Sequence, residues 1–346
     1  MSNISKIDKN FKVETTIEQD DIVFYNADDE RFEIFGIFKE DGKYRRLPES
    51  VAKAVSPGVL GLHAHTAGGR VRFVTDSPYV AINVKMGDVG KMPHFALTGS
   101  AGFDIYIDNT FWKSYVPPFD IVDSYESLRE LPNGDLREIT INFPLYSEVK
   151  ELYIGVREGS VIKKASPYKN DKPVVYYGSS ITQGGCASRP GSSYQAFVSR
   201  ALNIDYINLG FSGCAKAEDE IIEYIKSLPM SVFVYDYDHN APTLEHLKKT
   251  HEKMFKAVRE AQPELPIIMM VRPKHHLMGE EPKRLEVIKN TYENALKNGD
   301  KNVYFIDNKA LTKLCLADGL VDSNHPTDFG FYSMAEAVIS VLKDII

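Results

Sequence analysis

The second half of the sequence alternates short apolar segments with longer segments of helical periodicity, and this alternation constrains the fold more than any other feature. The apolar segments lie at 173–177, 204–209, 231–236, 266–271 and 302–306. The helical segments lie at 192–202, 217–227, 243–261, 281–297 and near 328–344. Apolar strands that alternate with helices predict a parallel sheet covered by helices on both faces. We therefore expect residues 172–346 to form one α/β domain with a flavodoxin-like sheet.

Before residue 165 the pattern differs, because short runs of alternating apolar and polar residues are separated by turn residues. These runs lie at 31–36, 71–74, 80–84, 103–107, 137–143 and 151–156. Short strands of period two at such spacing predict an antiparallel β-sandwich of the jelly-roll kind. A chain of 346 residues is long enough for two domains. We place the sandwich at 1–165, the α/β domain at 172–346 and the linker around 163–172.

The charge balance limits the kinds of partner and of location. Lys and Arg number 41 and Asp and Glu number 48, and no basic block stands out. This balance disfavours nucleic acid and anionic membranes as partners. Residues 1–10 are polar and lack the apolar core of a signal peptide, and no later run is long enough to span a bilayer. We therefore expect a cytoplasmic location.

The sequence indicates neither a metal site nor a cofactor site. Its three cysteines are too few and too irregularly spaced for a disulfide framework or a zinc site; they are Cys186, Cys214 and Cys315. The paired histidines lack a third ligand at a recognisable spacing; they are His63 with His65 and His275 with His276. Residues 236–240 begin like a calcium loop, but an EF-hand needs glycine and glutamate where Ala241 and Leu247 stand. We expect no metal and no cofactor.

The aromatic content leaves two interpretations open. The chain holds 19 Tyr and 18 Phe, and most are expected to pack in the core and against the sheets. The alternative is that some line a site for a sugar or another ligand with an apolar face. Trp112, close to 115–118, is one candidate to reach such a site from the sandwich, with core packing as the alternative.

Polar residues follow four of the five predicted parallel strands, at the point where each strand ends. Ser180 follows the first, Gly213 the second, Asn240 the third, and Asp322 with His325 the fifth. The carboxyl ends of parallel strands share one edge of a sheet, and ligands bind at that edge where the strand order reverses. We therefore expect these five residues to lie near one another.

The residue types at that edge predict acyl transfer. A serine hydroxyl is a weak nucleophile until a base takes its proton, and the base works best when a third group orients it. Ser180, His325 and Asp322 supply nucleophile, base and orienting acid, although each alone is more often a cap or turn residue. Gly213 N–H, the Asn240 side chain and Ser180 N–H are candidate donors to an oxyanion. The simpler roles are a turn glycine for Gly213 and a helix cap for Asn240.

In order and spacing, these positions resemble the blocks of the SGNH (GDSL-type) hydrolase family over about 172–346. The blocks read Gly178-Ser179-Ser180-Ile181, then 208–213 with Gly213, then 236–240 with Asn240, and finally Asp322-Ser323-Asn324-His325-Pro326. The chain departs from the family pattern at Ser179, where the family has aspartate, and at 236–240, where the family has Gly-x-Asn-Asp. The resemblance implies the same triad and the same three oxyanion donors.

The first half also resembles a known domain. Residues 66–73, 75–77 and 102–106 are similar to a β-sandwich with a Gly-x-Asp-Leu-Tyr signature that precedes some SGNH hydrolases. Proteins of this design, and the similar family 2 carbohydrate esterases, are associated with deacetylation of sugars. In that signature we interpret Asp104 as a residue that stabilises the sandwich rather than one that catalyses.

These observations predict a serine esterase that removes short acyl groups, most simply acetyl, from mono- or oligosaccharides through an acyl-enzyme. A lipase or thioesterase acting on non-sugar esters is the alternative among enzymes. A carbohydrate-binding protein with a vestigial hydrolase domain is the alternative from another class. The sequence leaves open the acyl group, the sugar, the regioselectivity and the oligomeric state, a homo-oligomer included.

Overall fold

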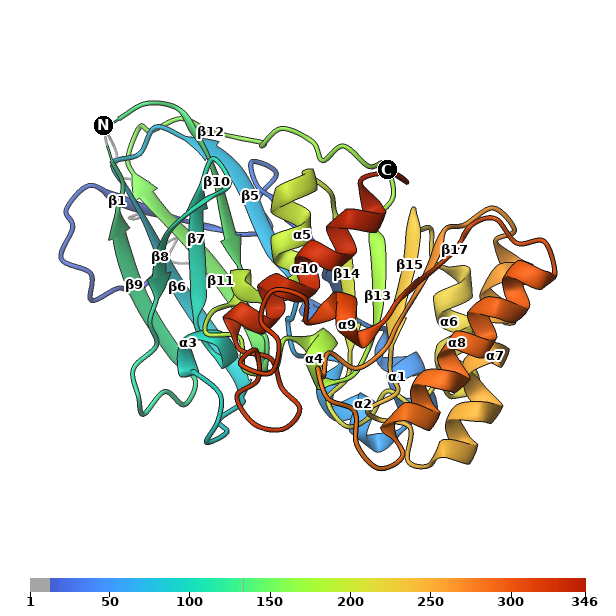
Figure 1. The fold of residues 1–346 in the computed structure, drawn as a ribbon. Coiled ribbons are helices and arrows are strands. Elements are labelled where there is room, and N and C mark those ends of the chain that lie inside the picture. The colour runs from blue at the N-terminus through green and yellow to red at the C-terminus, as the bar shows by residue number, and fades with distance from the viewer. Residues whose placement is uncertain (1–12, 133) are drawn as a thin grey trace.

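The computed structural model describes residues 13–132 and 134–346, and its two halves differ in the kind of sheet they contain (Figure 1). Residues before 165 form antiparallel sheets, and residues after 172 form a parallel sheet flanked by helices. In Figure 1 the antiparallel sheets lie on the left and the parallel sheet with its helices lies on the right. The predicted fold classes of both halves are therefore confirmed.

The first half is a sandwich of two sheets around one apolar core. The first sheet contains β1 (Ile22–Asn26), β11 (Ser147–Arg157), β6 (Tyr79–Val89) and β9 (Ser124–Glu130), in that order. The second contains β12 (Ile162–Lys163), β5 (Arg70–Thr75), β10 (Arg137–Asn142), β7 (Phe103–Ile107) and β8 (Thr110–Tyr115), with β2 (Glu33–Phe35) paired to β5. A separate hairpin joins β3 (Phe38–Glu40) to β4 (Lys43–Arg45). Alternate residues of β6 and β10, such as Val80, Ile82, Ile139 and Ile141, meet in the shared core, as period-two patterning requires.

The second half contains a five-stranded parallel sheet of order β14-β13-β15-β16-β17. Its strands are β13 (Val174–Gly178), β14 (Tyr206–Gly210), β15 (Val232–Asp236), β16 (Ile267–Met270) and β17 (Val303–Ile306). This is the flavodoxin-like order, in which the first strand lies between the second and the third. From β13 the chain adds β14 on one side of the sheet and then β15, β16 and β17 on the other side. The strand order therefore reverses at β13, and on such sheets ligands bind beside the carboxyl end of the strand where the order reverses.

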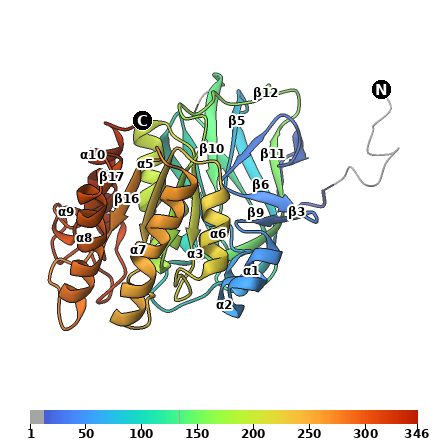
Figure 2. The same ribbon diagram turned by 90° about the vertical axis from the view of Figure 1, so that its right-hand side faces the viewer.

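Helices cover both faces of the parallel sheet. The longer ones are α5 (Tyr194–Leu202), α6 (Asp219–Ser227), α7 (Leu244–Ala261), α8 (Glu281–Lys297) and α10 (Asp328–Leu342). Figures 1 and 2 show α6, α7 and α8 on the face away from the sandwich, and α5 and α10 on the face toward it. All residues of β13 and β15 are buried, which explains their nearly continuous apolar sequences. Much of the aromatic content is also core, since Phe233, Tyr235 and His251 stack inside this half.

Two short helices in the first half pack on the second half, which the period-two pattern did not predict. They are α1 (Glu49–Val55) and α2 (Pro57–Leu62), with α3 (Leu97–Ser100) further along the chain. Ala52 and Val59 belong to the same apolar core as the parallel sheet, and α1 lies beside α6 (Figure 2). Ser56 caps α2, and Pro57 occupies its first turn, where a missing N–H costs nothing.

Asp104 joins the halves through its buried carboxyl group. Its oxygens accept hydrogen bonds from Asn142 Nδ2 at 2.7 Å and from the Gly191 backbone N–H at 2.7 Å. Asn142 lies in β10, whereas Gly191 lies in the 3₁₀ turn η3 (Pro190–Ser192) of the second half. Burial raises the pKa of Asp104, and these two hydrogen bonds lower it. Asp104 therefore holds the sandwich against the α/β half and lies outside the chemistry described below.

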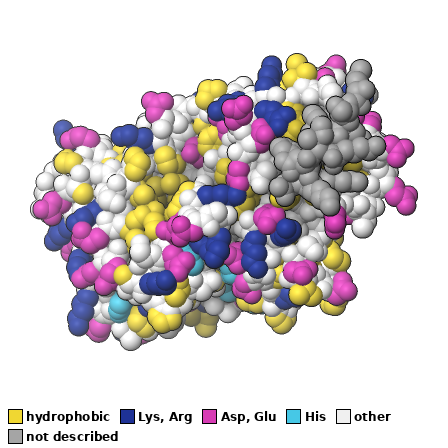
Figure 3. Space-filling model, turned by 180° about the vertical axis from the view of Figure 1, so that it is seen from behind, with side chains coloured by type: hydrophobic (Ala, Val, Ile, Leu, Met, Phe, Trp, Pro, Cys, Tyr) yellow, Lys and Arg dark blue, Asp and Glu magenta, His cyan; other side chains and the backbone are white. Residues whose placement is uncertain are grey.

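No helix among residues 13–132 and 134–346 is both long enough and apolar enough to cross a bilayer. Figure 3 shows acidic and basic side chains intermixed over the rear face of the molecule, in keeping with the nearly balanced charge count.

Candidate active site

The tight turn after β13 presents Ser180 at the start of α4 (Ser180–Gln183). Ser179 caps this single turn of helix, because its hydroxyl accepts a hydrogen bond from Ile181 N–H at 3.2 Å. Gly184 ends it with φ of 103°, a conformation that favours glycine. Serine at 179 thus replaces the family's aspartate with another residue able to cap a helix.

His325 and Asp322 complete a continuous chain of hydrogen bonds with Ser180. His325 Nε2 lies 2.9 Å from Ser180 Oγ, and His325 Nδ1 lies 2.8 Å from Asp322 Oδ2. Each distance is that of a good hydrogen bond. The structure therefore brings together the three residues that the sequence predicted as a triad, although Ser180 and His325 are 145 positions apart.

The loop that carries His325 and Asp322 is fixed at both ends. Asp322 Oδ1 accepts hydrogen bonds from the backbone N–H of Asn324 at 2.7 Å and of His325 at 2.6 Å. Immediately afterwards, Thr327 caps α10 by accepting from Gly330 N–H at 3.2 Å. Partial burial raises the pKa of Asp322, but the hydrogen bonds from His325 and the two backbone groups outweigh it and bring the pKa to about 2. Asp322 is therefore a carboxylate at neutral pH, as an acid that orients an imidazole must be.

Gly213 and Asn240 lie on the loops that follow β14 and β15. Gly213 is exposed with φ of 69°, and among the described residues its N–H donates no hydrogen bond to any other group. Asn240 Nδ2 donates to Phe211 O at 2.9 Å, which fixes the amide against the loop that carries Gly213. The amide NH₂ has two hydrogens, and this bond uses one of them. Asn240 does not cap α7, because Thr243 accepts the capping hydrogen bond from His246 N–H.

Residues outside the predicted set hold the Gly213 loop in place. The buried Gln183 accepts from Ser212 N–H at 3.0 Å and donates to Leu145 O at 3.1 Å. The buried guanidinium of Arg46 donates to Asn208 O at 3.0 Å and to Gly210 O at 2.8 Å. Burial lowers the pKa of Arg46 to about 9, which still leaves it charged at neutral pH. Both residues tie the first half to the end of β14 and the loop that carries Gly213.

The first half also contributes aromatic side chains to the surroundings of the triad. Tyr146 Oη donates to the Ser180 carbonyl at 3.0 Å. The His94 and Phe95 rings lie with their centroids 5.4 Å and 6.2 Å from that of His325. Trp112, the sequence-based candidate for this position, instead donates to Glu130 O between β8 and β9. No sequence pattern indicates His94 or Phe95, because they lie in an irregular segment after β6.

Asp236, at the end of β15, packs directly behind the turn that presents Ser180. Its carboxyl accepts a hydrogen bond from the Thr182 hydroxyl, and a Cβ at position 178 would come within 1.8 Å of Asp236 Oδ1. Glycine at 178 therefore makes room for this carboxyl group. Burial is the main cause that raises the pKa of Asp236 to about 8, with Asp238 adding to it and Thr182 opposing it.

The raised pKa of Asp236 predicts a specific dependence of stability on pH. Because the folded-state pKa lies above the unfolded value, the native state binds more protons between about pH 4 and about pH 8. The stability from this group is full below about pH 4 and declines as pH rises to about 8, by at most about 1.4 kcal/mol per pH unit. Asp236→Asn keeps the acceptor for Thr182 and cannot ionise. We expect urea unfolding at several pH values to show that the free energy of unfolding falls less steeply with pH in the variant than in the wild type. Equal slopes in the two proteins would contradict the raised pKa of Asp236.

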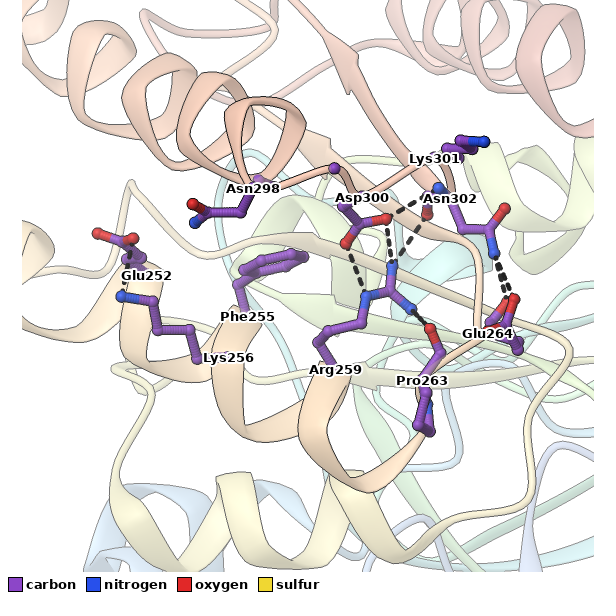
Figure 4. Close-up of a pocket in the computed structure, with 12 residues that line it drawn as sticks. Glu252, Phe255, Lys256, Arg259, Pro263, Glu264, Asn298, Asp300, Lys301 and Asn302 are labelled. Atoms are coloured by element: carbon purple, nitrogen blue, oxygen red, sulfur yellow. Dashed lines mark hydrogen bonds and ion pairs between the residues drawn. The ribbon is translucent and has the colours of Figure 1, made fainter.

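A second surface feature lies away from this chemistry. A hollow of about 470 Å³ is found between the C-terminal parts of α7 and α8 (Figure 4). Its polar groups largely bind one another, since Arg259 Nε pairs with Asp300 at 2.7 Å and Asn302 Nδ2 contacts Glu264. His275, one of the paired histidines, contacts Thr312 Oγ1 at 3.1 Å.

Comparison with protein families gives a match for each half of the chain. The model of the GDSL-like lipase/acylhydrolase family matches residues 171–343. The model of the N-terminal domain of SGNH-hydrolase-type esterases, with its Gly-x-Asp-Leu-Tyr signature, matches residues 22–162. No curated protein matches the chain in sequence.

Solved structures with the same two-part design include one at 29% identity and several that are more distant. An assumed GDSL-like lipase from Bacteroides ovatus has a TM-score of 0.81, with 94% of this chain and 98% of that chain covered. A salicylyl-acyltransferase from a tetracycline biosynthetic pathway is 20% identical, with a TM-score of 0.76 and the same coverage. An acetyl xylan esterase from the rumen bacterium Butyrivibrio proteoclasticus is 13% identical, with a TM-score of 0.61 over 93% and 98% of the two chains.

The last two similarities concern the fold alone, because both identities are low. The family match does not depend on them. It spans half of the chain and includes every residue of the Ser180, His325 and Asp322 arrangement. The chain belongs to the GDSL-like lipase/acylhydrolase family.

Proposed function

We propose that this protein is a serine esterase that forms an acyl-enzyme on Ser180. The observation that carries the proposal is the unbroken chain from Ser180 Oγ through His325 to Asp322, with both contacts at hydrogen-bond distance. A nucleophile, a base and an orienting carboxylate in this geometry are what acyl transfer needs. Ser180 is also half-buried rather than enclosed, so an ester has access to its hydroxyl.

In the first step His325 Nε2 accepts the Ser180 proton while Oγ attacks the ester carbonyl carbon. The resulting imidazolium is stabilised by Asp322, which stays ionised throughout. His325 then gives its proton to the departing alcohol oxygen, and the ester bond breaks to leave acyl-Ser180. A water molecule next loses a proton to His325 and attacks the acyl carbon. Release of the acid restores the Ser180 hydroxyl with the proton that His325 returns.

The carbonyl oxygen becomes an anion in both tetrahedral intermediates, and we assign its donors to Ser180 N–H, Gly213 N–H and Asn240 Nδ2–H. Removal of one such donor costs about 10²–10³ in kcat. We expect Asn240→Ala to lower kcat for aryl acetate hydrolysis by that factor with little change in KM, since the donor acts on charge that develops in the transition state. Asn298→Ala, at the exposed end of α8, is the control. A loss that falls mainly on KM would assign Asn240 to substrate binding instead.

We further propose that the substrate is a short acyl ester, most simply an acetyl ester, of a mono- or oligosaccharide. Two observations support this choice. The chain shares its fold over nearly its full length with an acetyl xylan esterase. In addition, the exposed His94 and partly buried Phe95 place two rings beside His325, and aromatic rings suit the apolar faces of sugars.

The test is a panel of esters followed by NMR detection of the released acid. The panel contains acetylated mono- and oligosaccharides, p-nitrophenyl acetate, longer-chain acyl esters and an acyl thioester. Turnover of acetylated sugars with the highest kcat/KM supports the proposal. Preference for long-chain esters or thioesters would instead favour a lipase or thioesterase, and turnover of none would favour the carbohydrate-binding alternative.

The acyl acceptor needs its own measurement, because the fold is shared with a salicylyl-acyltransferase. An acyl-enzyme reacts with water or with an alcohol that reaches the same carbon. The reaction is therefore run with p-nitrophenyl acetate in the presence of increasing concentrations of a free sugar. Free acetate as the main product supports an esterase, whereas transfer of most acetyl groups to the sugar would identify a transferase.

A further inference from the structure

We propose that His94, Cys186 and His325 form a binding site for a borderline-soft divalent transition metal such as Zn²⁺, and that the bound metal inhibits the enzyme. One ligand atom from each of these residues lies within 4.8 Å of the other two. The three residues come from separate segments: the loop after β6, the loop after α4 and the loop before α10. No local spacing pattern joins them, so the sequence predicted no metal site.

The catalytic geometry already prepares His325 as a ligand. Its Nδ1 is bound to Asp322 at 2.8 Å, so Nε2 is the nitrogen that faces away from the carboxylate. A carboxylate that binds one imidazole nitrogen orients the ring and raises the basicity of the other, as it does around zinc in many proteins. The residue that serves as base for Ser180 is for the same reason a well-oriented metal ligand.

The distances fit a metal after small side-chain movements. Zinc binds imidazole nitrogen at about 2.0–2.1 Å and thiolate sulfur at about 2.3 Å, so ligand atoms around it lie about 3.5 Å apart. The three atoms here are at most 4.8 Å apart. His94 is exposed on an irregular segment, so we assign the required approach to rotation of the His94 side chain. Three protein ligands leave a fourth position for water or for Ser180 Oγ.

The backbone at Cys186 belongs to the turn that presents Ser180. Cys186 has φ of 73°, in the left-handed region that non-glycine residues seldom adopt. Such conformations persist where the surrounding structure enforces them, and they gather at functional sites. Two hydrogen bonds flank the position: Gly185 N–H donates to Ser180 O at 2.8 Å, and Ala187 N–H donates to Gly184 O at 3.1 Å. The turn that presents Ser180 therefore also holds the backbone of Cys186, whose thiol the ester mechanism does not use.

Inhibition follows from competition for one lone pair. A metal on His325 Nε2 occupies the electron pair that must accept the Ser180 proton, so the metal-bound enzyme cannot start acylation. Imidazole and thiolate donors select Zn²⁺, Co²⁺ or Cu²⁺ over Mg²⁺ and Ca²⁺, which prefer oxygen ligands. Binding of the metal does not depend on the proposed esterase activity, whereas the inhibition does.

The site is tested first by Co²⁺ titration of the full-length protein, because cobalt bound to thiolate gives charge-transfer absorption that free cobalt lacks. We expect these bands in the wild type and in Ser180→Ala, their loss in Cys186→Ala, and at least about tenfold weaker binding in His94→Ala. Cys315→Ala, which removes a different buried cysteine, should keep the bands. Absence of the bands in the wild type, or equal bands in Cys186→Ala, would overturn the site.

The inhibition is tested with Zn²⁺ on p-nitrophenyl acetate hydrolysis, each variant being compared with its own metal-free rate. We expect inhibition of the wild type that EDTA reverses, no inhibition by Mg²⁺, and at least about tenfold lower sensitivity to zinc in Cys186→Ala and His94→Ala. Equal zinc sensitivity in all variants would overturn the inhibitory role. Cobalt bands in a protein that hydrolyses no ester would overturn the proposed function and leave the metal site standing.

Discussion

The Ser180→Ala variant is expected to lose at least about 10⁴-fold in kcat/KM toward p-nitrophenyl acetate while it folds normally. The Ser180 hydroxyl is the only protein group in the proposed mechanism that forms a bond to the acyl carbon, and the acyl-enzyme cannot form without it. Ser180 is half-buried and its Oγ contacts His325 Nε2, so its removal leaves a small gap at the surface rather than a cavity in the core. The measurement is the steady-state rate, together with mass spectrometry of protein quenched during turnover. The wild type should carry an acyl group on the peptide that contains Ser180.

The matched control is Ser323→Ala, which deletes an exposed hydroxyl two residues from His325. We expect this variant to keep its activity within about twofold, because substitutions of exposed side chains have small effects. Retention of full turnover by Ser180→Ala would exclude a covalent intermediate on this serine. A loss of equal size in Ser323→Ala would show instead that the assay responds to disturbance of the whole loop.

The second large effect is expected from Asp322→Asn, which should lower kcat by about 10²–10⁴-fold. The structure explains why so small a change has this effect. Two backbone N–H groups, of Asn324 and His325, donate to Asp322 Oδ1, and they would hold the oxygen of the new amide. The amide NH₂ then faces His325 Nδ1, which must accept a hydrogen bond and place its proton on Nε2. A protonated Nε2 cannot take the proton of Ser180.

The control for Asp322→Asn is Asp318→Asn, which makes the same charge change at an exposed position nearby in the chain. It should leave kcat nearly unchanged, because the charge of an exposed side chain is screened by solvent and salt. The variants are compared by kcat and by thermal unfolding. If the unfolding temperature of Asp322→Asn falls so far that the variant is unfolded in the assay, misfolding explains the lost activity and the tautomer argument fails. If Asp322→Asn keeps full activity, another carboxylate orients His325.

Much of the fold follows from patterns within short stretches of sequence. The five apolar segments became β13 to β17, and the amphipathic segments between them became the long helices. Burial on both faces requires such strands to be apolar throughout, which makes them recognisable without any tertiary information. The sandwich was predicted in the same way, because alternation of period two is a local property of half-buried strands.

The arrangement of the candidate triad also followed from the sequence, for a topological reason. Parallel strands place all their carboxyl ends at one edge, so residues that follow different strands converge there whatever their separation along the chain. Ser180, Gly213, Asn240 and His325 each follow a different strand end. Their catalytic roles remain predictions that the variants described above will test.

Only the tertiary structure decided which residues surround that edge. His94 and Tyr146 reach the site from the first half, and Arg46 supports the end of β14 through backbone carbonyls. Asp236 lies behind the turn that presents Ser180. These contacts involve side chains from irregular segments or buried polar groups, and neither has a periodic signature. The sequence by itself determined the elements and the edge at which the polar residues meet, because both depend on local patterning and strand direction. The cluster of His94, Cys186 and His325 exists only because two halves pack together, and packing between distant segments depends on the shape of the whole molecule.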